Sequence, residues 1–356
     1  MKKIISIIIC VALLCPALLT SCGRDEEEVS VLYFTFSDAY ISSVRSAMEA
    51  SLKEKNIGYH SYDGATNQTT QTEQVDTAIT KGTRLLAVNI IDTGSEDAAK
   101  AIISKARAAD IPLIFFNRSV DDAVVASYDK CVFIGTDYEQ AGHIQGEMIG
   151  NYLVENYQKL DINGDGRISY VLFKGQQGNS EAEARTKYSV LDANRILAEN
   201  GKPSLVFYDK NNPSGFLLDQ NGSWSNAAAN NHMKTVLSGY SEAGGNMVEL
   251  VIANNDEMAL GALAALEEAG YNKEGGRYIP VFGVDAIEGA RSKIREGKMT
   301  GTVVQDGKAM AASMAQVAEN MLLGREPFFE MDSEGIVSEH RLNIPYSVYT
   351  GEEKTE

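Results

Sequence analysis

The 356-residue sequence predicts an α/β protein built from two doubly wound lobes. From residue 29 onward, short apolar runs alternate with amphipathic helical stretches, which is typical of parallel sheets covered by helices on both faces. About ten apolar runs are too many for one small sheet and favour two lobes of about 130 to 150 residues each. No proline-rich or low-complexity linker divides the chain, so we expect it to cross between the lobes more than once.

The predicted strands and helices follow from these runs. The strand candidates are residues 31–36, 57–62, 85–89, 113–117, 131–134, 168–174, 205–208, 248–253, 279–283 and 300–304. The helix candidates are residues 41–52, 74–79, 98–108, 141–157, 181–198, 227–237, 257–269, 287–295 and 309–323.

The first 22 residues have the features of a signal peptide. Lys2 and Lys3 precede an apolar stretch at residues 4–14, and the segment Leu19-Thr-Ser-Cys22 resembles a bacterial lipobox. This pattern predicts cleavage before Cys22, lipid attachment to Cys22, and a short acidic tether at residues 23–28. The alternatives are an ordinary cleaved signal peptide and an N-terminal anchor helix, although the apolar run is short for a membrane span.

The net charge bears on the partners of the protein, and the cysteine count bears on whether it has a disulfide. The net charge of -17 and the pI near 4.8 argue against a nucleic-acid partner and against electrostatic docking on anionic lipid. Removal of residues 1–21 would take away two of the four cysteines, and Cys22 would carry lipid. Only Cys131 would remain, so we expect no intramolecular disulfide.

Polar side chains follow the apolar runs at the predicted strand ends. These side chains are Asp38, Asn117, Asn255, Asp285 and Gln305. Each could simply cap the helix that follows it. Because ligands of doubly wound sheets bind outside the carboxyl ends of the strands, the five together indicate one hydrogen-bonding pocket.

Residues 161–169 match the opening of an EF-hand-type calcium loop. Oxygen-bearing side chains occupy positions 1, 3, 5 and 9, a glycine occupies position 6, and a backbone carbonyl would serve at position 7. These residues are Asp161, Asn163, Asp165, Ser169, Gly166 and Arg167, respectively. Position 12 is Leu172 instead of the usual bidentate glutamate, so a further carboxylate must come from elsewhere. The alternative is a plain Asx-rich turn.

Enzyme motifs are missing from the sequence. It contains no GxxxxGK[ST], no GxGxxG after a strand, no CxxC, no HExxH and no GxSxG. The four histidines are scattered without metal-ligand spacing. We therefore predict that the protein is not an enzyme.

Several segments resemble a known family. Residues 174–186, 251–256 and 280–286, supported by residues 115–117, 128–130 and 301–304, resemble the galactose/glucose-binding proteins of bacterial ABC sugar transport. These are periplasmic binding proteins of the ribose-binding type. The resemblance covers roughly residues 29 to 350.

The resemblance implies the periplasmic binding protein type I fold, in which three hinge strands join two lobes. It places the crossings near residues 135–137, 305–307 and 332–340. The expected N-terminal lobe comprises residues 29–135 and 306–335. The expected C-terminal lobe comprises residues 136–305 and 336–350 and includes the calcium-type loop.

The resemblance also implies a sugar site between the lobes. It assigns hydroxyl partners to Asp38 and Asn117 from the first lobe and to Arg185, Asn255 and Asp285 from the second. Tyr40 and Trp224 would cover the two faces of the sugar ring; the alternative for Trp224 is a partly exposed anchor at a helix start. Asn179, Glu181 and Gln305 complete the set, standing where the family has histidine, aspartate and asparagine. Such changes could shift the preference between sugar epimers, because an unpaired buried hydroxyl costs on the order of 1–3 kcal/mol.

For the calcium-type loop, the resemblance supplies Glu249 as the missing carboxylate. The implied structural calcium ion would then be held by Asp161, Asn163, Asp165, the carbonyl of Arg167, Ser169 and Glu249. Ser169 stands where the family has glutamine, so its shorter side chain could require a bridging water.

The implied function is capture of glucose or galactose by a monomer and delivery to an ABC transporter permease. The lipid on Cys22 would hold the protein at the membrane on its extracytoplasmic side. An alternative is a sugar sensor that presents its closed form to a chemoreceptor or histidine kinase. A second alternative, a sugar-metabolising enzyme, is disfavoured because the sequence lacks catalytic motifs. A third, a transcription repressor of related fold, would need an N-terminal helix-turn-helix, and this chain has a secretion signal there instead.

Overall fold

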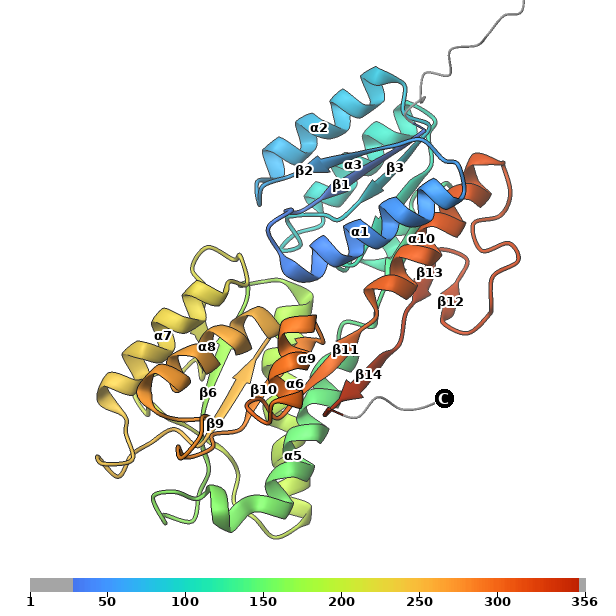
Figure 1. The fold of residues 1–356 in the computed structure, drawn as a ribbon. Coiled ribbons are helices and arrows are strands. Elements are labelled where there is room, and N and C mark those ends of the chain that lie inside the picture. The colour runs from blue at the N-terminus through green and yellow to red at the C-terminus, as the bar shows by residue number, and fades with distance from the viewer. Residues whose placement is uncertain (1–27, 352–356) are drawn as a thin grey trace, which may run out of the picture.

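The computed structural model describes residues 28–351, which form two α/β lobes placed end to end (Figure 1). The predicted signal peptide, Cys22 and residues 23–27 of the tether lie outside the described residues.

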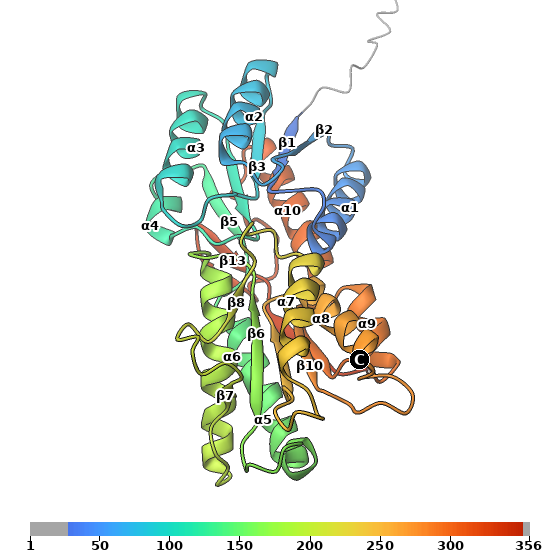
Figure 2. The ribbon, with the colours of Figure 1, turned by 90° about the vertical axis from the view of Figure 1, so that its left-hand side faces the viewer.

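The first lobe contains most of the N-terminal half of the chain and a return segment near the C-terminus (Figure 2). Its elements are β1 (Val29–Tyr33), α1 (Ala39–Glu54), β2 (Tyr59–Asp63), α2 (Gln68–Lys81), β3 (Leu85–Val88), α3 (Asp97–Ala108), β4 (Leu113–Phe116), α4 (Asp122–Val125), β5 (Cys131–Gly135), α10 (Gly307–Leu322), β12 (Ile336–Ser338) and β13 (Arg341–Asn343).

The second lobe takes up the middle of the chain and its last strand. Its elements are α5 (Gln140–Leu160), β6 (Ser169–Lys174), α6 (Ser180–Glu199), β7 (Val206–Phe207), β8 (Leu217–Leu218), α7 (Asn226–Gly239), β9 (Leu250–Ala253), α8 (Asp256–Ala269), β10 (Val281–Asp285), α9 (Glu288–Arg295), β11 (Gly301–Gln305) and β14 (Tyr346–Tyr349).

Each lobe is organised around one sheet. The strand order is β12-β13-β5-β4-β3-β1-β2 in the first lobe and β14-β11-β10-β9-β6-β7 in the second, where β8 also pairs with β6. All pairings are parallel except β12 with β13 and β11 with β14. The predicted pair of doubly wound lobes is therefore confirmed, although each sheet is mixed because an antiparallel strand lies at one edge.

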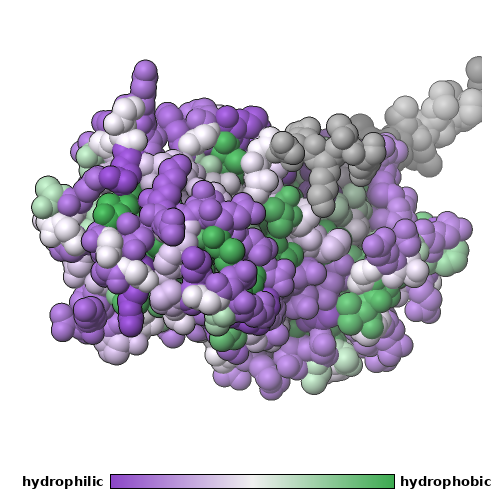
Figure 3. All heavy atoms as spheres, turned by 90° about the horizontal axis from the view of Figure 1, so that it is seen from below, coloured by the Kyte–Doolittle hydropathy of each residue, from purple (hydrophilic) through white to green (hydrophobic). Residues whose placement is uncertain are grey.

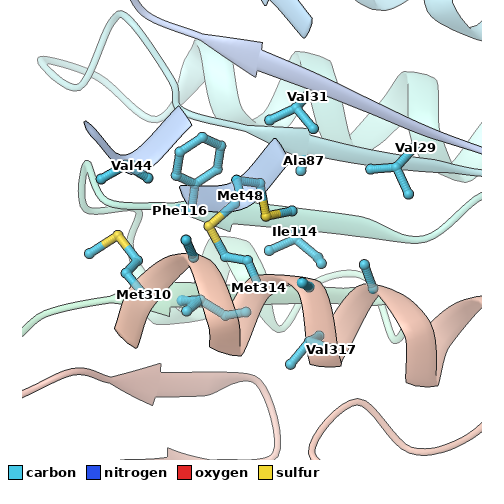
Figure 4. Packing of buried hydrophobic residues seen from close by; sticks show 14 of the residues in the cluster. Val29, Val31, Val44, Met48, Ala87, Ile114, Phe116, Met310, Met314 and Val317 are labelled. Carbon is cyan, nitrogen blue, oxygen red and sulfur yellow. The ribbon is translucent and has the colours of Figure 1, made fainter. Parts of the chain in front are cut away.

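Successive residues along the strands of the first sheet point to opposite faces, where they form two separate hydrophobic cores. Val31 and Phe116 pack against α1 and α10, where Met48, Met310 and Met314 fill the space between the helices and the sheet (Figure 4). The intervening strand residues face α2 and α3 in the second cluster. Helices thus cover both faces, which explains why these strands are apolar throughout.

The second lobe repeats this arrangement. Helices α7 and α8 cover one face of its sheet, and α5 and α6 cover the other. Helices α5 and α6 approach closely at Gly142, where an added Cβ would lie only 2.6 Å from the carbonyl oxygen of Ala184. A side chain at this position would push α6, which carries pocket residues, away from α5.

The chain crosses between the lobes three times, and two crossings lie where the sequence places them. The first follows β5, and the second follows β11 at Gln305. The third crossing does not lie within residues 332–340. It lies at Ile344 and Pro345, between β13 of the first sheet and β14 of the second.

This difference also corrects the lobe boundary. Residues 336–343, which the sequence reading assigned to the C-terminal lobe, form β12 and β13 at the edge of the first sheet. Each strand is only three residues long and contains polar residues such as Ser338 and Arg341, so neither has the apolar run that marks the longer strands.

The surface of the second lobe's lower end is mostly hydrophilic, with hydrophobic residues scattered over it (Figure 3). No helix within residues 28–351 combines the length and the apolar character required to cross a bilayer.

Candidate functional site

A pocket lies between the lobes, lined by residues of both. Every residue that the sequence assigns to the sugar lines this pocket: Asp38, Tyr40, Asn117, Asn179, Glu181, Arg185, Trp224, Asn255, Asp285 and Gln305. Phe34, Ile41 and Arg118 complete the lining.

Three pocket residues also cap the N-termini of the helices that follow them. Asp38 accepts from the Ile41 N–H at 2.8 Å, Asn179 from the Ala182 N–H at 2.9 Å, and Asn255 from the Met258 N–H at 3.0 Å. The capping interpretation and the pocket interpretation therefore hold for the same side chains. The capping bonds fix each side chain where its helix meets the pocket.

Three other pocket residues have backbones in the left-handed region. The φ angles are 63° at Asn117, 56° at Trp224 and 115° at Asp285. Non-glycine residues in such conformations typically cost about 1–3 kcal/mol and persist where the surroundings hold them. The chain thus tolerates strain at the places where it turns these side chains into the pocket.

Arg185 connects the pocket floor with the crossing segments. Its guanidinium donates to the Asn254 carbonyl at 2.9 Å, to Gln305 Oε1 at 3.3 Å and to the Tyr346 hydroxyl at 3.2 Å. The Tyr346 hydroxyl also lies 3.0 Å from the Thr136 hydroxyl. Thr136, Gln305 and Tyr346 lie at or next to the three crossings. Arg185 is therefore linked to all three, directly through Gln305 and Tyr346 and indirectly through Thr136.

On another side of the pocket, the lobes are joined by hydrogen bonds. The Ser119 N–H donates to Glu181 Oε1 at 2.7 Å, and Asn179 Nδ2 donates to the Thr93 hydroxyl at 3.1 Å. The Arg118 guanidinium also donates to Gln176 Oε1. The structure is therefore a closed form, in which segment 176–181 of the second lobe contacts the first lobe.

Three buried polar atoms of pocket residues have no hydrogen-bond partner within the described part of the chain. They are Glu181 Oε2, Arg185 Nε and Gln305 Nε2. Unpaired buried polar groups are rare because each loses its hydration without compensation. Together they offer one acceptor and two donors to a ligand that carries both kinds of group.

Burial has the largest effect on the pKa values of the pocket carboxyl groups Asp285 and Asp38. It raises the pKa of Asp285 well above the ordinary value of 3.8, although the Arg185 guanidinium, 3.8 Å from the Asp285 carboxylate, works in the opposite direction. Burial likewise raises the pKa of Asp38. Hydroxyl donors from a ligand would stabilise both carboxylates in their charged forms.

Two aromatic side chains on different lobes provide apolar surface in the pocket. Tyr40 is buried, with its hydroxyl 4.0 Å from Met310 Sδ. The Trp224 ring lies against Gly175, where an added Cβ would be only 2.1 Å from the ring. Trp224 is 8% exposed, so the alternative of a partly exposed helix anchor is wrong.

Sequence reasoning missed Arg118, which follows Asn117 at the same strand end. Its guanidinium donates to the Ile91 carbonyl at 2.7 Å and lies 4.6 Å from the centre of the Phe34 ring. Burial lowers its pKa. Arg118 could have been found by including the second polar residue after the predicted strand. Phe34 could not, because nothing in its apolar run separates it from the residues that face the core.

The calcium-type loop and Glu249 lie together in the structure. The Glu249 carboxylate is fully buried and accepts from the N–H groups of Ile162 at 2.7 Å and Ser169 at 2.8 Å. Gly166 has φ 79°, which permits the bend expected at position 6. The distant carboxylate that the resemblance supplies is therefore beside the loop.

The donor chemistry of this loop suits a hard cation. Asp161 Oδ1 is buried without a hydrogen-bond partner among the described residues, and burial raises the pKa of Glu249. Within residues 28–351, no three His, Cys, Asp or Glu side chains gather closely enough to hold a metal by themselves. A calcium ion here would depend on amide, carbonyl and hydroxyl oxygens as well as carboxylates.

The fold and the pocket between the lobes define a two-lobed binding protein. Residues 29–326 match the model of the periplasmic binding protein domain family, and the chain therefore belongs to this family of binding proteins. The assignment made from the sequence is confirmed, as is the conclusion that this is a binding-protein family and not an enzyme family.

Individual relatives agree with this assignment. The chain is 33% identical over 301 residues to the D-galactose/methyl-galactoside binding periplasmic protein MglB of Haemophilus influenzae, covering 84% of this chain and 83% of the relative. It is 23% identical over 326 residues to the ribose import binding protein RbsB of Escherichia coli, covering 92% and 94%.

Solved structures share the fold. An ABC transporter solute binding protein from Clostridium phytofermentans with bound β-D-glucose has a TM-score of 0.68 and 22% identity, covering 84% of this chain and 85% of that one. One from Bacillus halodurans with bound myo-inositol has a TM-score of 0.67 and 24% identity, covering 92% and 95%.

Proposed function

We propose that this protein is the solute-binding component of an ABC transporter and captures glucose- or galactose-type monosaccharides between its lobes. The observation that carries this proposal is the closed pocket in which Glu181 Oε2, Arg185 Nε and Gln305 Nε2 are buried without partners. A sugar hydroxyl can donate and accept at once, so a ring of hydroxyls matches this mixture of acceptors and donors.

The remaining pocket chemistry suits a pyranose. Its C–H faces are apolar and can pack on the rings of Tyr40 and Trp224, which come from different lobes. Its hydroxyls would be met at the edge by Asp38, Asn117 and Asp285. The 33% identity to a galactose-binding relative supports the glucose or galactose class.

Capture requires no covalent step. The open lobes would bind the sugar, rotation about the three crossings would bury it, and the contacts between segment 176–181 and the first lobe would hold the closed form. The closed form would then dock on a membrane permease. The chain's own contribution is to orient the sugar and to exclude water from it.

The experiment that tests the ligand class is thermal unfolding of the mature protein with a panel of sugars. D-glucose, D-galactose and methyl β-D-galactoside at about 100 times the dissociation constant should raise the melting temperature by on the order of 5 °C. D-mannitol, an open-chain polyol, serves as the control. Stabilisation by none of the three sugars would contradict the proposed ligand class.

We also propose a lipid anchor on Cys22, which would hold the protein near its permease on the extracytoplasmic side. The lipobox-like segment supports this, and several acyl chains are needed because one gives only marginal binding. The intact mass of the membrane-extracted wild-type protein should include acyl chains, and that of Cys22→Ala should not. A wild-type protein without acyl chains would contradict the lipid anchor.

Finally, we propose a structural calcium ion at the 161–169 loop. Asp161, Asn163, Asp165, Ser169, the Arg167 carbonyl and Glu249 would hold it, and the ion would supply charge neutralisation for the three carboxylates. No ion pair of these carboxylates occurs within residues 28–351. This leaves a cation as the natural counter-charge.

A further inference from the structure

Asp256 is a buried carboxylate that does not line the pocket. It is the first residue of α8, directly after the pocket residue Asn255, and its side chain is fully buried. A buried carboxylate is costly unless its oxygens are hydrogen-bonded, and here both oxygens have partners.

The two oxygens of Asp256 bond to two different elements. Asp256 Oδ1 accepts from the Thr302 hydroxyl at 2.6 Å, and Asp256 Oδ2 accepts from the Ile287 N–H at 2.9 Å. Thr302 lies on β11, which leads to the pocket residue Gln305 and the second crossing. Ile287 lies two residues after the pocket residue Asp285.

A glycine in β10 makes room for this arrangement. Gly283 pairs with Thr302 across β10 and β11, and a Cβ at Gly283 would lie 2.2 Å from Asp256 Oδ1. The Asp256 carboxylate therefore crosses β10 at the one residue without a side chain and reaches β11. Any larger residue at position 283 would displace the carboxylate.

The turn that Asp256 contacts is strained. Asp285 and Ala286 have φ angles of 115° and 56°, which side chains with a Cβ rarely adopt. The turn is supported on one side by a 2.9 Å bond from Arg291 Nε to the Ala286 carbonyl. On the other side it is supported by the bond from Ile287 to Asp256.

We propose that Asp256 is a positioning residue for sugar binding, because it ties the strained Asp285–Ile287 turn to the hinge strand β11. The proposal rests on the proposed function, since Asp285 would act on a bound sugar. Without this tie, the Asp285 carboxylate would leave its place beside Arg185, and the turn and hinge would no longer move as one unit during closure.

Two measurements test the proposal on the full mature protein. The first is amide hydrogen exchange of Ile287 without ligand, and the second is titration calorimetry with D-galactose and D-glucose. In Asp256→Ala, we expect Ile287 to exchange at least about tenfold faster and both sugars to bind at least about tenfold more weakly.

Matched variants separate positioning from general stability. Asp256→Asn should stay within about threefold of wild type, because its oxygen can accept from Ile287 while its amide donates to Thr302. Gly283→Ala keeps Asp256 but should displace its carboxylate, so we expect the same faster exchange at Ile287 and the same weaker sugar binding as in Asp256→Ala. Thr302→Val should weaken binding and Thr302→Ser should not.

The control is Asp192→Ala. Asp192 is a buried carboxylate of the same lobe that pairs with His143 and Arg195, away from the turn. It should keep wild-type affinity and wild-type exchange at Ile287.

Wild-type exchange and affinity in folded Asp256→Ala would overturn the proposal. If that variant fails to fold, wild-type behaviour of both Gly283→Ala and Thr302→Val would overturn it. If the wild-type protein binds neither sugar, the proposed function fails, and the exchange rate of Ile287 alone decides whether Asp256 holds the turn.

Discussion

Glu181 of the second lobe accepts a 2.7 Å hydrogen bond from the backbone N–H of Ser119 in the first lobe. The other carboxylate oxygen of Glu181 lies buried in the pocket without a partner. One carboxylate is thus positioned both to hold the lobes together and to receive a ligand hydroxyl. A ligand hydroxyl bound to Glu181 would therefore couple lobe closure to ligand binding.

Glu181→Gln should therefore weaken sugar binding at least about tenfold. Its amide would present a donor to the ligand where the carboxylate presents an acceptor, and a mismatched buried group costs about 1–3 kcal/mol. Titration calorimetry measures the change. Glu147→Gln, an exposed position on α5 that pairs with Arg195, serves as the control. Equal affinities of Glu181→Gln and wild type would show that Glu181 does not contact the ligand.

Sugar binding should change the fluorescence of Trp224. It is the only tryptophan in the chain and it lines the pocket, so its emission reports this site alone. We expect a saturable change on titration with D-galactose or D-glucose. Trp224→Ala should lose at least about tenfold in affinity, because a stacked aromatic contributes about 0.5–1.5 kcal/mol beyond its buried area. A sugar that binds by calorimetry without altering the emission would place its site elsewhere.

The proposed calcium ion should stabilise the second lobe. A chelator is expected to lower the melting temperature by several degrees while leaving sugar affinity within about threefold, because neither Glu249 nor any residue of the 161–169 loop lines the pocket. Asp161→Ala and Asp165→Ala should show the lower melting temperature even with calcium present. If neither the chelator nor these substitutions changes the melting temperature, no calcium ion stabilises the loop.

Stability without ligand should depend on pH through Asp256. Burial raises its pKa from 3.8 to about 7, although bonds from Thr302 and from the Ile287 and Ala286 backbone oppose this, as does the charge of Arg185. Because the folded-state pKa is the higher one, its contribution is fully present below about pH 3.8 and is lost as pH rises through about 7. The loss is on the order of 4 kcal/mol at most.

Denaturant unfolding at pH 5 and pH 8 measures this contribution. The difference between the two pH values should be smaller in Asp256→Asn than in wild type, since the amide does not titrate. Identical pH dependence in the two proteins would show that Asp256 ionises normally.

The hydrophobic periodicity of the sequence was sufficient to predict most of the helices and strands. Strand β4 was expected at residues 113–117 and lies at Leu113–Phe116, and α3 was expected at 98–108 and lies at Asp97–Ala108. Strands β8, β12, β13 and β14 were missed because they are only two to four residues long and their stability comes from pairing with neighbouring strands at or near a sheet edge. Without a buried apolar run they leave no periodic signal, and the third crossing was misplaced in consequence.

The site residues also divide into those that the sequence pattern predicted and those that it could not. Polar residues at strand ends located the pocket, because parallel strands bring their carboxyl ends to one edge. Asn179, Glu181, Arg185 and Trp224 came only from the family resemblance. The contact between Glu181 and Ser119 could not be predicted, because it depends on the angle between the lobes and not on any local pattern.

Isothermal titration of the mature wild-type protein with D-galactose and D-glucose measures whether one monosaccharide of the glucose or galactose class binds between the lobes. We expect heat with at least one of the two sugars, a stoichiometry of about one sugar per chain, and loss of that heat in Asp285→Ala. If neither sugar gives heat, or if Asp285→Ala binds as the wild type does, the protein does not bind such a sugar at this site.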